Sequence, residues 1–421
     1  MNILVLTELN HGKYAVTHGI CCNAIATELI KMGHSIHFLQ EKVYGNEPDE
    51  EMIDGFTIHR IPRTFHRKLS VCSAESNRSI KGKVSRIFLR IISAQVVLLY
   101  PWYPLRRPLL TFKVMRKAKK LHESVGFDMT FCSYYPMSAL YAGEYLKKKC
   151  GVPFVSYLLE SFTNITGNRF LLSKTFMNNQ GLKYEKRFFS ASDLILNLKC
   201  HEEHFQNSDY SAFSHKMQIT DIPYLKDRTR STHSERSKNH INLVYTGGVK
   251  RHLVQTVISF FSEINDVTFH VYGPNNNAFP DCRFIVKHGK VSYKDALYAQ
   301  DTADILVSMG NAEDTYNFIP SKIFDYISTG KKIVHFHHTN NDVSISYYKK
   351  YANCCLVNTS DDYKKNLDKL REFLSSNEEV IEWNELEKLF PMNKAQYTAE
   401  LVEELFLANP GFRKRNVDIC S

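Results

Sequence analysis

The chain has 421 residues, 43% of them hydrophobic, and is therefore long enough to bury the cores of two ordinary domains. Its formal net charge is +10. It contains no apolar run of the roughly 18 residues that a membrane span needs, so we predict none. Met1 leads directly into an apolar run with no basic region before it, which argues against a signal peptide. The ten cysteines form no C-x-x-C pair, so we expect free thiols and a cytoplasmic protein.

The first 39 residues are typical of a Rossmann-like opening. An apolar strand pattern is followed by a loop with Gly12 and Gly19 at its two ends, a helix that Gly33 ends, and a second strand. The loop glycines do not form the G-x-G-x-x-G pattern of dinucleotide-binding proteins. We therefore do not predict a standard dinucleotide site.

Residues 60–120 carry a strong positive charge. They contain 16 lysines and arginines against one acid, Glu75, which gives a net charge of +15. Apolar and aromatic residues are interleaved with the arginines, and this mixture is suited to an anionic membrane surface. A helical insertion with a solvated basic face explains the pattern equally well. Nucleic acid is disfavoured because no nucleic-acid-binding motif accompanies the charge.

Strand, helix and strand patterns alternate in residues 127–164, and Glu160 follows the second strand. A carboxylate at the carboxyl end of a strand in an open parallel sheet points towards the ligand crevice. Further on, residues 226–240 are polar, and we predict that they link two Rossmann-like halves.

The second half opens at Ile241 with an apolar strand pattern. Gly247 and Gly248 follow it, and then Lys250 and Arg251. Glycines let a ligand approach the backbone, and neighbouring cations can neutralise a diphosphate. The alternative is an ordinary turn beside a solvated pair of cations.

The segment 317–334 places a helix between two strand patterns, residues 304–309 and 332–336. Ser321 is suited to cap the start of this helix, and Gly330 is suited to end it. A strand-helix-strand order of this kind predicts a parallel sheet, in which the loop before the helix faces the ligand.

Asp325 lies one turn into this helix. The N–H groups at a helix start attract phosphate, and a carboxylate beside them can accept hydrogen bonds from ribose hydroxyls. In the alternative interpretation the helix is an ordinary amphipathic one, and Asp325 pairs with Lys322 on its surface.

The run PSKIFDYISTGKKIV, which begins at Pro320, resembles the P-S-K-[IL]-F-E-Y-x-x-x-G-K-P-[IV] signature of retaining glycosyltransferase family 4. That family includes the group 1 glycosyltransferases of cell-surface polysaccharide synthesis. The resemblance implies an α/β protein with the GT-B fold, in which two facing Rossmann-like domains with parallel sheets enclose an interdomain cleft. It also makes Pro320, Ser321 and Lys322 candidates for binding the donor.

Two acids eight residues apart contact the donor sugar nucleotide in this family. The second acid usually binds the ribose, and Asp325 matches it. The first falls on Asn317, which can form hydrogen bonds but carries no charge, and which we take as a candidate contact with the sugar. Glu313 and Asp314 lie just upstream as possible substitutes. The sequence also departs from the signature at Lys332, where the family usually has proline.

The resemblance implies further roles. Lys250 and Arg251 match basic residues that stabilise the leaving diphosphate. His288 and Gly289 match a segment that lines the base pocket. Glu160 takes the place of an acid that many members carry after the corresponding strand.

The resulting domain plan has four parts. The parts are residues 1–225 as an acceptor domain with the insertion 60–120, 226–240 as a linker, 241–390 as a nucleotide-sugar domain, and 391–421 as a C-terminal helical segment that returns to the first domain. The helix pattern itself covers residues 395–408.

We therefore predict a glycosyltransferase that moves a sugar from a UDP- or GDP-linked donor to an acceptor hydroxyl, with retention. The acceptor would be a lipid-linked or polysaccharide intermediate in cell-surface glycan synthesis, and the protein would be cytoplasmic or peripheral at the inner face of the cell membrane. We expect no metal or other cofactor, because His335, His337 and His338 lack complementary ligands and no D-x-D motif is present. The alternatives are a GT-B sugar-nucleotide epimerase and a noncatalytic partner subunit.

Overall fold

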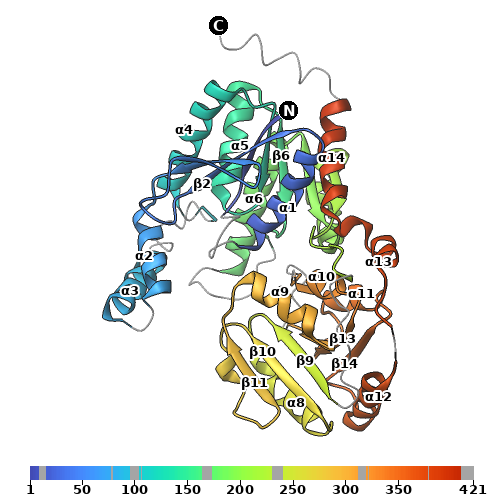
Figure 1. Cartoon of the computed structure of the whole chain (residues 1–421). Helices are drawn as coiled ribbons and strands as arrows, with labels where there is room; N and C mark the ends of the chain where they lie inside the picture. Colours follow the sequence, from blue (N-terminus) through green and yellow to red (C-terminus); the bar gives the residue numbers. More distant parts are fainter. Residues whose placement is uncertain are drawn as a thin grey trace. The chain divides into compact units, whose positions relative to one another are not determined.

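The computed structural model describes residues 1–8, 16–76, 79–94, 104–105, 107–163, 173–229, 240–311, 319–320, 322–377 and 379–408. The chain forms two compact units. Unit 1 comprises Met1–Pro223 and Ala395–Ser421, and unit 2 comprises Tyr224–Lys394. Each unit contains a largely or wholly parallel β-sheet with helices (Figure 1), which confirms the predicted α/β class with two parallel-sheet domains.

In its described residues, unit 1 has an eight-stranded sheet of order β3-β4-β2-β1-β5-β6-β7-β8, parallel except between β3 and β4. The strands are β1 (Asn2–Leu6), β2 (Ser35–Glu41), β3 (Glu50–Ile53), β4 (Phe56–Ile61), β5 (Met129–Ser133), β6 (Phe154–Leu158), β7 (Leu194–Leu198) and β8 (Met217–Thr220). The helices are α1 (Thr17–Lys31), α2 (Phe65–Glu75), α3 (Ile80–Ala94), α4 (Pro108–Val125), α5 (Met137–Cys150), α6 (Lys174–Ala191), α7 (Glu202–Phe205) and α14 (Ala395–Ala408). Strands β5, β6 and β7 are buried throughout, as expected of apolar runs covered on both faces.

The C-terminal helix α14 occupies the residues that its sequence pattern predicts. It packs on α1 and on β8 within unit 1. The hydroxyl groups of Thr220 and Thr398 share a buried hydrogen bond of 2.5 Å between β8 and α14. This helix therefore completes unit 1 from the far end of the sequence.

In its described residues, unit 2 has a six-stranded parallel sheet of order β11-β10-β9-β12-β13-β14. The strands are β9 (Ile241–Thr246), β10 (Val267–Tyr272), β11 (Ile285–Gly289), β12 (Ile305–Met309), β13 (Lys332–His337) and β14 (Cys354–Asn358). The helices are α8 (Arg251–Ser262), α9 (Tyr293–Thr302), α10 (Lys322–Ile327), α11 (Ser344–Tyr348), α12 (Tyr363–Ser375) and α13 (Trp383–Leu389). From β9 the chain adds strands on one side and then, from β12, on the other, so the topological switch point lies between β9 and β12.

The start of the predicted linker is packed on unit 2. Arg228 is 11% exposed, and its guanidinium forms an ion pair of 2.6 Å with Asp301. It also donates to the side chain of Gln300 and to the carbonyl oxygen of Asp325, both at 2.8 Å. Residues 230–239 of that linker lie outside the described residues. Because Arg228 is bound on several sides, the chain enters unit 2 in a fixed position.

Candidate functional site

The loops after β9 and β12 meet at the switch point of unit 2. Lys250, in the loop after β9, donates a hydrogen bond of 2.6 Å to the side-chain oxygen of Asn311, which follows β12. The backbone N–H of Asn311 in turn donates to Asp342 at 3.1 Å. Open parallel sheets bind ligands outside the carboxyl ends of their strands at such a point. The structure thus places a cation and an amide side chain where a ligand is expected.

Glycines bring the backbone of the neighbouring loops together. Gly247 has φ of +124° and Gly273 has φ of +145°, conformations that other residues rarely adopt. The N–H of Gly247 donates to Tyr272 at 2.8 Å, and the N–H of Gly273 donates to Gly289 at 2.7 Å. A Cβ atom on Gly273 would collide with the carbonyl group of Gly247. The loops after β9, β10 and β11 are therefore held in mutual contact.

The substitution Gly273→Ala is expected to destabilise unit 2 by roughly 2–4 kcal/mol, because it combines backbone strain with a backbone collision. Urea unfolding measures this change. Gly248→Ala is the matched control, since a Cβ atom there meets nothing within 4 Å and the residue lacks a positive φ. Equal stability of the two variants would contradict the assigned loop geometry.

Lys322 is the first residue of α10, and its side chain reaches the end of β9. Its amine donates 2.9 Å to the hydroxyl of Tyr245 and lies 4.3 Å from the centre of that ring. A Cβ atom on Gly247 would lie 3.1 Å from the same amine. Lys322 therefore lies next to the glycine loop that precedes Lys250.

The two lysines form a cationic cluster. Burial lowers the pKa of Lys322. Burial also lowers the pKa of Lys250, and the positive charge of Lys322 lowers it further, while Asp342 acts in the opposite direction. Two neighbouring ammonium groups repel each other, and an anion that binds beside them stabilises the charged form of both. The arrangement is suited to a phosphate or diphosphate.

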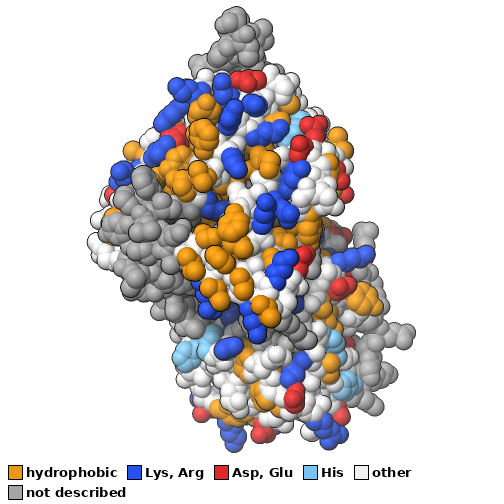
Figure 2. All heavy atoms as spheres, turned by 90° about the vertical axis from the view of Figure 1, so that its left-hand side faces the viewer, with side chains coloured by type: hydrophobic (Ala, Val, Ile, Leu, Met, Phe, Trp, Pro, Cys, Tyr) orange, Lys and Arg blue, Asp and Glu red, His pale blue; other side chains and the backbone are white. Residues whose placement is uncertain are grey.

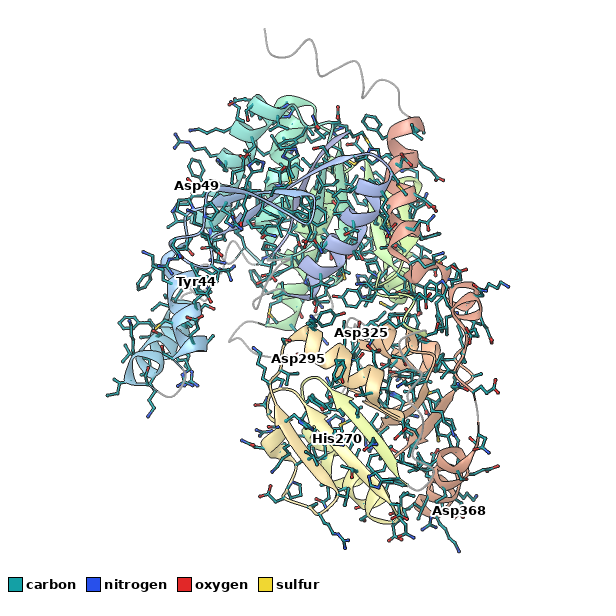
Figure 3. All side chains as sticks on the ribbon, viewed as in Figure 1. Tyr44, Asp49, His270, Asp295, Asp325 and Asp368 are labelled. Carbon is teal, nitrogen blue, oxygen red and sulfur yellow. The ribbon has the colours of Figure 1, made fainter. Side chains whose placement is uncertain are left out.

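Asp325 is buried in α10 (Figure 3). It accepts a hydrogen bond of 2.8 Å from the hydroxyl of Tyr293 on α9. Burial raises the pKa of Asp325, while that hydrogen bond and the positive charge of Arg228 act to lower it. The alternative interpretation, a surface pair between Asp325 and Lys322, is wrong, because one carboxylate oxygen binds Tyr293 and the lysine binds Tyr245.

Asp342 holds the loop after β12 through hydrogen bonds to its backbone. Its carboxylate accepts from the N–H groups of Asn311 and Ser344, at 3.1 and 2.8 Å. A Cβ atom on Gly310 would collide with it, so only glycine lets the strand end approach so closely. Asp342 thereby fixes Asn311, the partner of Lys250.

The other predicted donor-site residues are placed as follows. Arg251 is exposed on the first turn of α8, where it lines a surface pocket with Asn275 and Asn277 and not with Lys322. His288 is exposed, stacks on Tyr272 with ring centroids 4.0 Å apart, and shares a 3.0 Å contact with the ring nitrogen of His270. Gly289 accepts from Gly273, Gly248 is exposed, and Pro320 is buried. Asn317, Ser321, Glu313 and Asp314 lie outside the described residues.

Lys332, which departs from the signature, has a structural role. It is 1% exposed, and its amine donates to the carbonyl and hydroxyl oxygens of Ser376 after α12, both at 2.7 Å. The amine of Lys331 similarly binds the carbonyl oxygen of Ala303 at 2.5 Å. Both lysines satisfy carbonyl groups at helix ends and do not belong to the cationic cluster.

In unit 1, Glu160 lies half-buried just after β6. The turn that follows it is tied to a buried carboxylate, Glu185 on α6. Glu185 accepts from the hydroxyl of Ser161 at 2.8 Å and from the N–H of Phe162 at 2.7 Å. The hydroxyl of Tyr134, after β5, also donates to it at 2.5 Å. Glu160 is therefore carried on a firmly held turn.

A pocket that the sequence did not reveal lies at the carboxyl ends of β1, β2 and β4 in unit 1. Glu8, Glu41, Arg67 and Arg107 contribute to its wall. Burial raises the pKa of Glu8. Burial acts in the same direction on Glu41, but Arg107 and hydrogen bonds from Thr64 outweigh it and lower that pKa overall. The pocket offers both acceptors and donors to a polar ligand.

Within the described ranges, no group of three or more His, Cys, Asp or Glu side chains is arranged to hold a metal ion. In the same part of the chain, no helix has the length and apolar character to cross a bilayer.

No protein-family model matches the sequence, and neither does any curated protein. Solved structures do match. Sucrose-phosphate synthase from Thermosynechococcus elongatus is 12% identical over 97% of this chain and 99% of its own, with a TM-score of 0.57. An E. coli structure described as trehalose-6-phosphate bound with UDP-2-fluoro glucose is 11% identical over 96% of this chain and 99% of its own, with a TM-score of 0.59.

A structure from Listeria monocytogenes described as a UDP-N-acetylglucosamine 2-epimerase also matches. It is 8% identical over 98% of this chain and 97% of its own, with a TM-score of 0.53. At these identities the likeness concerns the fold. Together with the two parallel-sheet units, it shows that the chain has the GT-B fold.

Proposed function

We propose that the chain is a glycosyltransferase that takes a sugar from a UDP- or GDP-linked donor and transfers it to an acceptor hydroxyl. The observation that carries the proposal is the cationic cluster at the switch point of unit 2, where Lys322 contacts the glycine loop that precedes Lys250. Asp325 adds a buried carboxylate on the same helix as Lys322. Cations for a diphosphate and an acceptor for ribose hydroxyls are the two features that a nucleotide-sugar site requires.

In the proposed reaction the bond between the anomeric carbon and the diphosphate breaks, and a bond from that carbon to the acceptor oxygen forms. The acceptor hydroxyl loses its proton to the departing diphosphate or to solvent. Lys250 stabilises the charge that develops on the diphosphate, and Lys322 supports it. Asp325 holds the ribose, and Asn317 contacts the sugar. Retention of anomeric configuration follows from the family 4 resemblance and is part of the proposal.

The remaining assignments are finer proposals. His288 and Gly289 line the base pocket, Arg251 gives longer-range positive charge to the diphosphate, and Glu160 orients the acceptor or the sugar. The acceptor is a lipid-linked or polysaccharide intermediate of cell-surface glycan synthesis. An acceptor on a lipid would be met at a membrane surface, for which the basic segment 60–120 is suited.

The epimerase likeness supports a second candidate. An epimerase would convert the sugar nucleotide without any acceptor, whereas a transferase needs one. Incubation of the protein with labelled UDP- and GDP-sugars, with and without an acceptor fraction from cell envelopes, separates them. Acceptor-dependent release of UDP or GDP supports the proposal, and a changed sugar in the absence of acceptor contradicts it. No turnover of any donor would favour a noncatalytic partner subunit.

Tyr293→Phe is expected to make nucleotide binding more sensitive to acid. The tyrosine hydroxyl lowers the pKa of Asp325, so its removal raises that pKa further. Ribose binding needs the ionised carboxylate, and the affinity for the nucleotide therefore falls as the pH drops through the pKa of Asp325. In the variant this fall should occur at a higher pH than in wild type. Titration of UDP or GDP from about pH 4 to about pH 8 measures the shift. Identical pH profiles would contradict the role of Asp325.

A further inference from the structure

One face of α3 in unit 1 presents apolar side chains to solvent. Ile80, Val84, Ile87, Phe88 and Ile91 are between 43% and 81% exposed. They recur three and four residues apart, and therefore lie along one stripe of the helix. Figure 2 shows hydrophobic side chains gathered on this side of the molecule, with Lys and Arg side chains among them.

The opposite face of the helix is the buried one. Gly82 and Ser85 are buried there, and α3 packs against α2. An ordinary surface helix turns its apolar stripe to the core and its polar face to water. Here Gly82, Ser85 and the half-buried Leu89 face the protein, while five large apolar side chains face outward. The stripe is therefore available to another apolar phase.

Basic residues flank the stripe. Lys81, Lys83, Arg86 and Arg90 lie on α3, which contains no acidic residue. At helical spacing Lys83 and Arg90 fall along one border of the stripe and Lys81 along the other. Long basic side chains beside an apolar stripe can reach the phosphate groups of lipids while the stripe enters the acyl boundary.

The base of the α2–α3 hairpin is firmly held. Glu41 accepts from both the N–H and the hydroxyl of Thr64, the residue before α2, at 2.6 Å each. Arg67 on α2 and Arg107 before α4 also bind this carboxylate, at 3.3 and 3.0 Å. The start of α2 is thus fixed to unit 1, and α3, which carries the stripe, packs against α2.

We propose that α3 is an interfacial anchor that inserts its apolar stripe into the surface of an anionic lipid bilayer and lies in the plane of that surface. A second copy of the chain fits less well, because a twofold contact through the stripe would bring the basic flanks of two α3 helices together. Anionic headgroups neutralise those flanks. The inference goes beyond the proposed activity and uses no residue of the nucleotide cluster.

The test is vesicle flotation of the full chain at low and high salt. Wild type is expected to float with phosphatidylcholine vesicles that contain phosphatidylglycerol, and not with phosphatidylcholine alone. The double variant Ile87→Asp, Ile91→Asp is expected to bind at least about tenfold more weakly. The double variant Lys83→Gln, Arg90→Gln should lose about fivefold in affinity for these vesicles per charge removed, and the loss should be greatest at low salt. Met52→Asp, at a 68% exposed apolar residue on β3, is the matched control and should bind like wild type.

Several results would overturn the proposal: no flotation with any vesicle, flotation that the α3 variants leave unchanged, or a dimer in light scattering that the isoleucine variant dissociates. Urea unfolding of each variant checks that it is folded. UDP and GDP titrations of the same variants separate this proposal from the transferase proposal, because the variants should bind nucleotide as wild type does.

Discussion

Lys250→Ala is expected to lower kcat for sugar transfer by roughly a hundred- to a thousandfold, the usual cost of losing one preorganised group at a developing charge. Lys250 lies at the switch point and is held by Asn311, so its amine is positioned before the ligand arrives. Charge on the diphosphate is greatest as the bond to the sugar breaks, and the loss should therefore appear in kcat more than in KM. Steady-state kinetics with the active donor measure it.

Lys364→Ala is the matched control, because Lys364 is exposed on α12 of the same unit. Arg251→Ala should have a smaller effect than Lys250→Ala, since Arg251 lines a different pocket. Full activity of Lys250→Ala, or a larger loss for Arg251→Ala, would contradict the assignment of the diphosphate site.

Asp325→Ala is expected to weaken binding of UDP or GDP by roughly ten- to a hundredfold, the value of hydrogen bonds between a carboxylate and two hydroxyls. The carboxylate is already desolvated in the free protein and is held by Tyr293. The free energy of burying it therefore belongs to folding and does not weaken nucleotide binding. Asp325→Asn should fall between wild type and Ala, because the amide oxygen still accepts. Calorimetric titration measures the three affinities.

Asp368→Ala provides the control for Asp325. Asp368 is 62% exposed on α12 (Figure 3), and its replacement should leave both affinity and stability unchanged. If Asp325→Ala bound nucleotide as tightly as wild type, the ribose would have to lie elsewhere, and the family resemblance would no longer support this site.

Much of the fold could be predicted from local patterns. The strands predicted at 304–309 and 332–336 appear as β12 and β13, and the helix predicted at 395–408 is α14. The helix between β12 and β13 is shorter than predicted. It ends at Ile327, and Gly330, whose φ is +69°, follows two turn residues later. Periodicity indicates that an element exists, but its end depends on tertiary contacts.

The site was predictable only in part. Glycines and cations after β9 pointed to the loop that the structure places at the switch point, but Lys250 and Arg251 are adjacent in sequence and diverge where α8 begins. The partners Asn311, Asp342 and Tyr293 could not be foreseen, because each acts across more than thirty residues or from another element, and no local pattern records such a contact.

The basic segment shows the same limit. Its composition left a membrane surface and a solvated helical insertion as equal alternatives. The structure resolves the described part into α2, α3 and α4 and shows which face of α3 is buried. Gly82 is buried and Phe88 is exposed, so the apolar stripe of α3 faces solvent. The sequence pattern alone does not show which face of an amphipathic helix is buried.

If the switch point of unit 2 binds a nucleoside diphosphate, hydrogen exchange of the full chain should change there when UDP or GDP is added. One of the two nucleotides is expected to slow exchange in the loop after β9, at Gly310 and Asn311, and in α10 around Asp325. Unchanged exchange with both nucleotides, or protection confined to unit 1, would contradict a nucleotide site in unit 2.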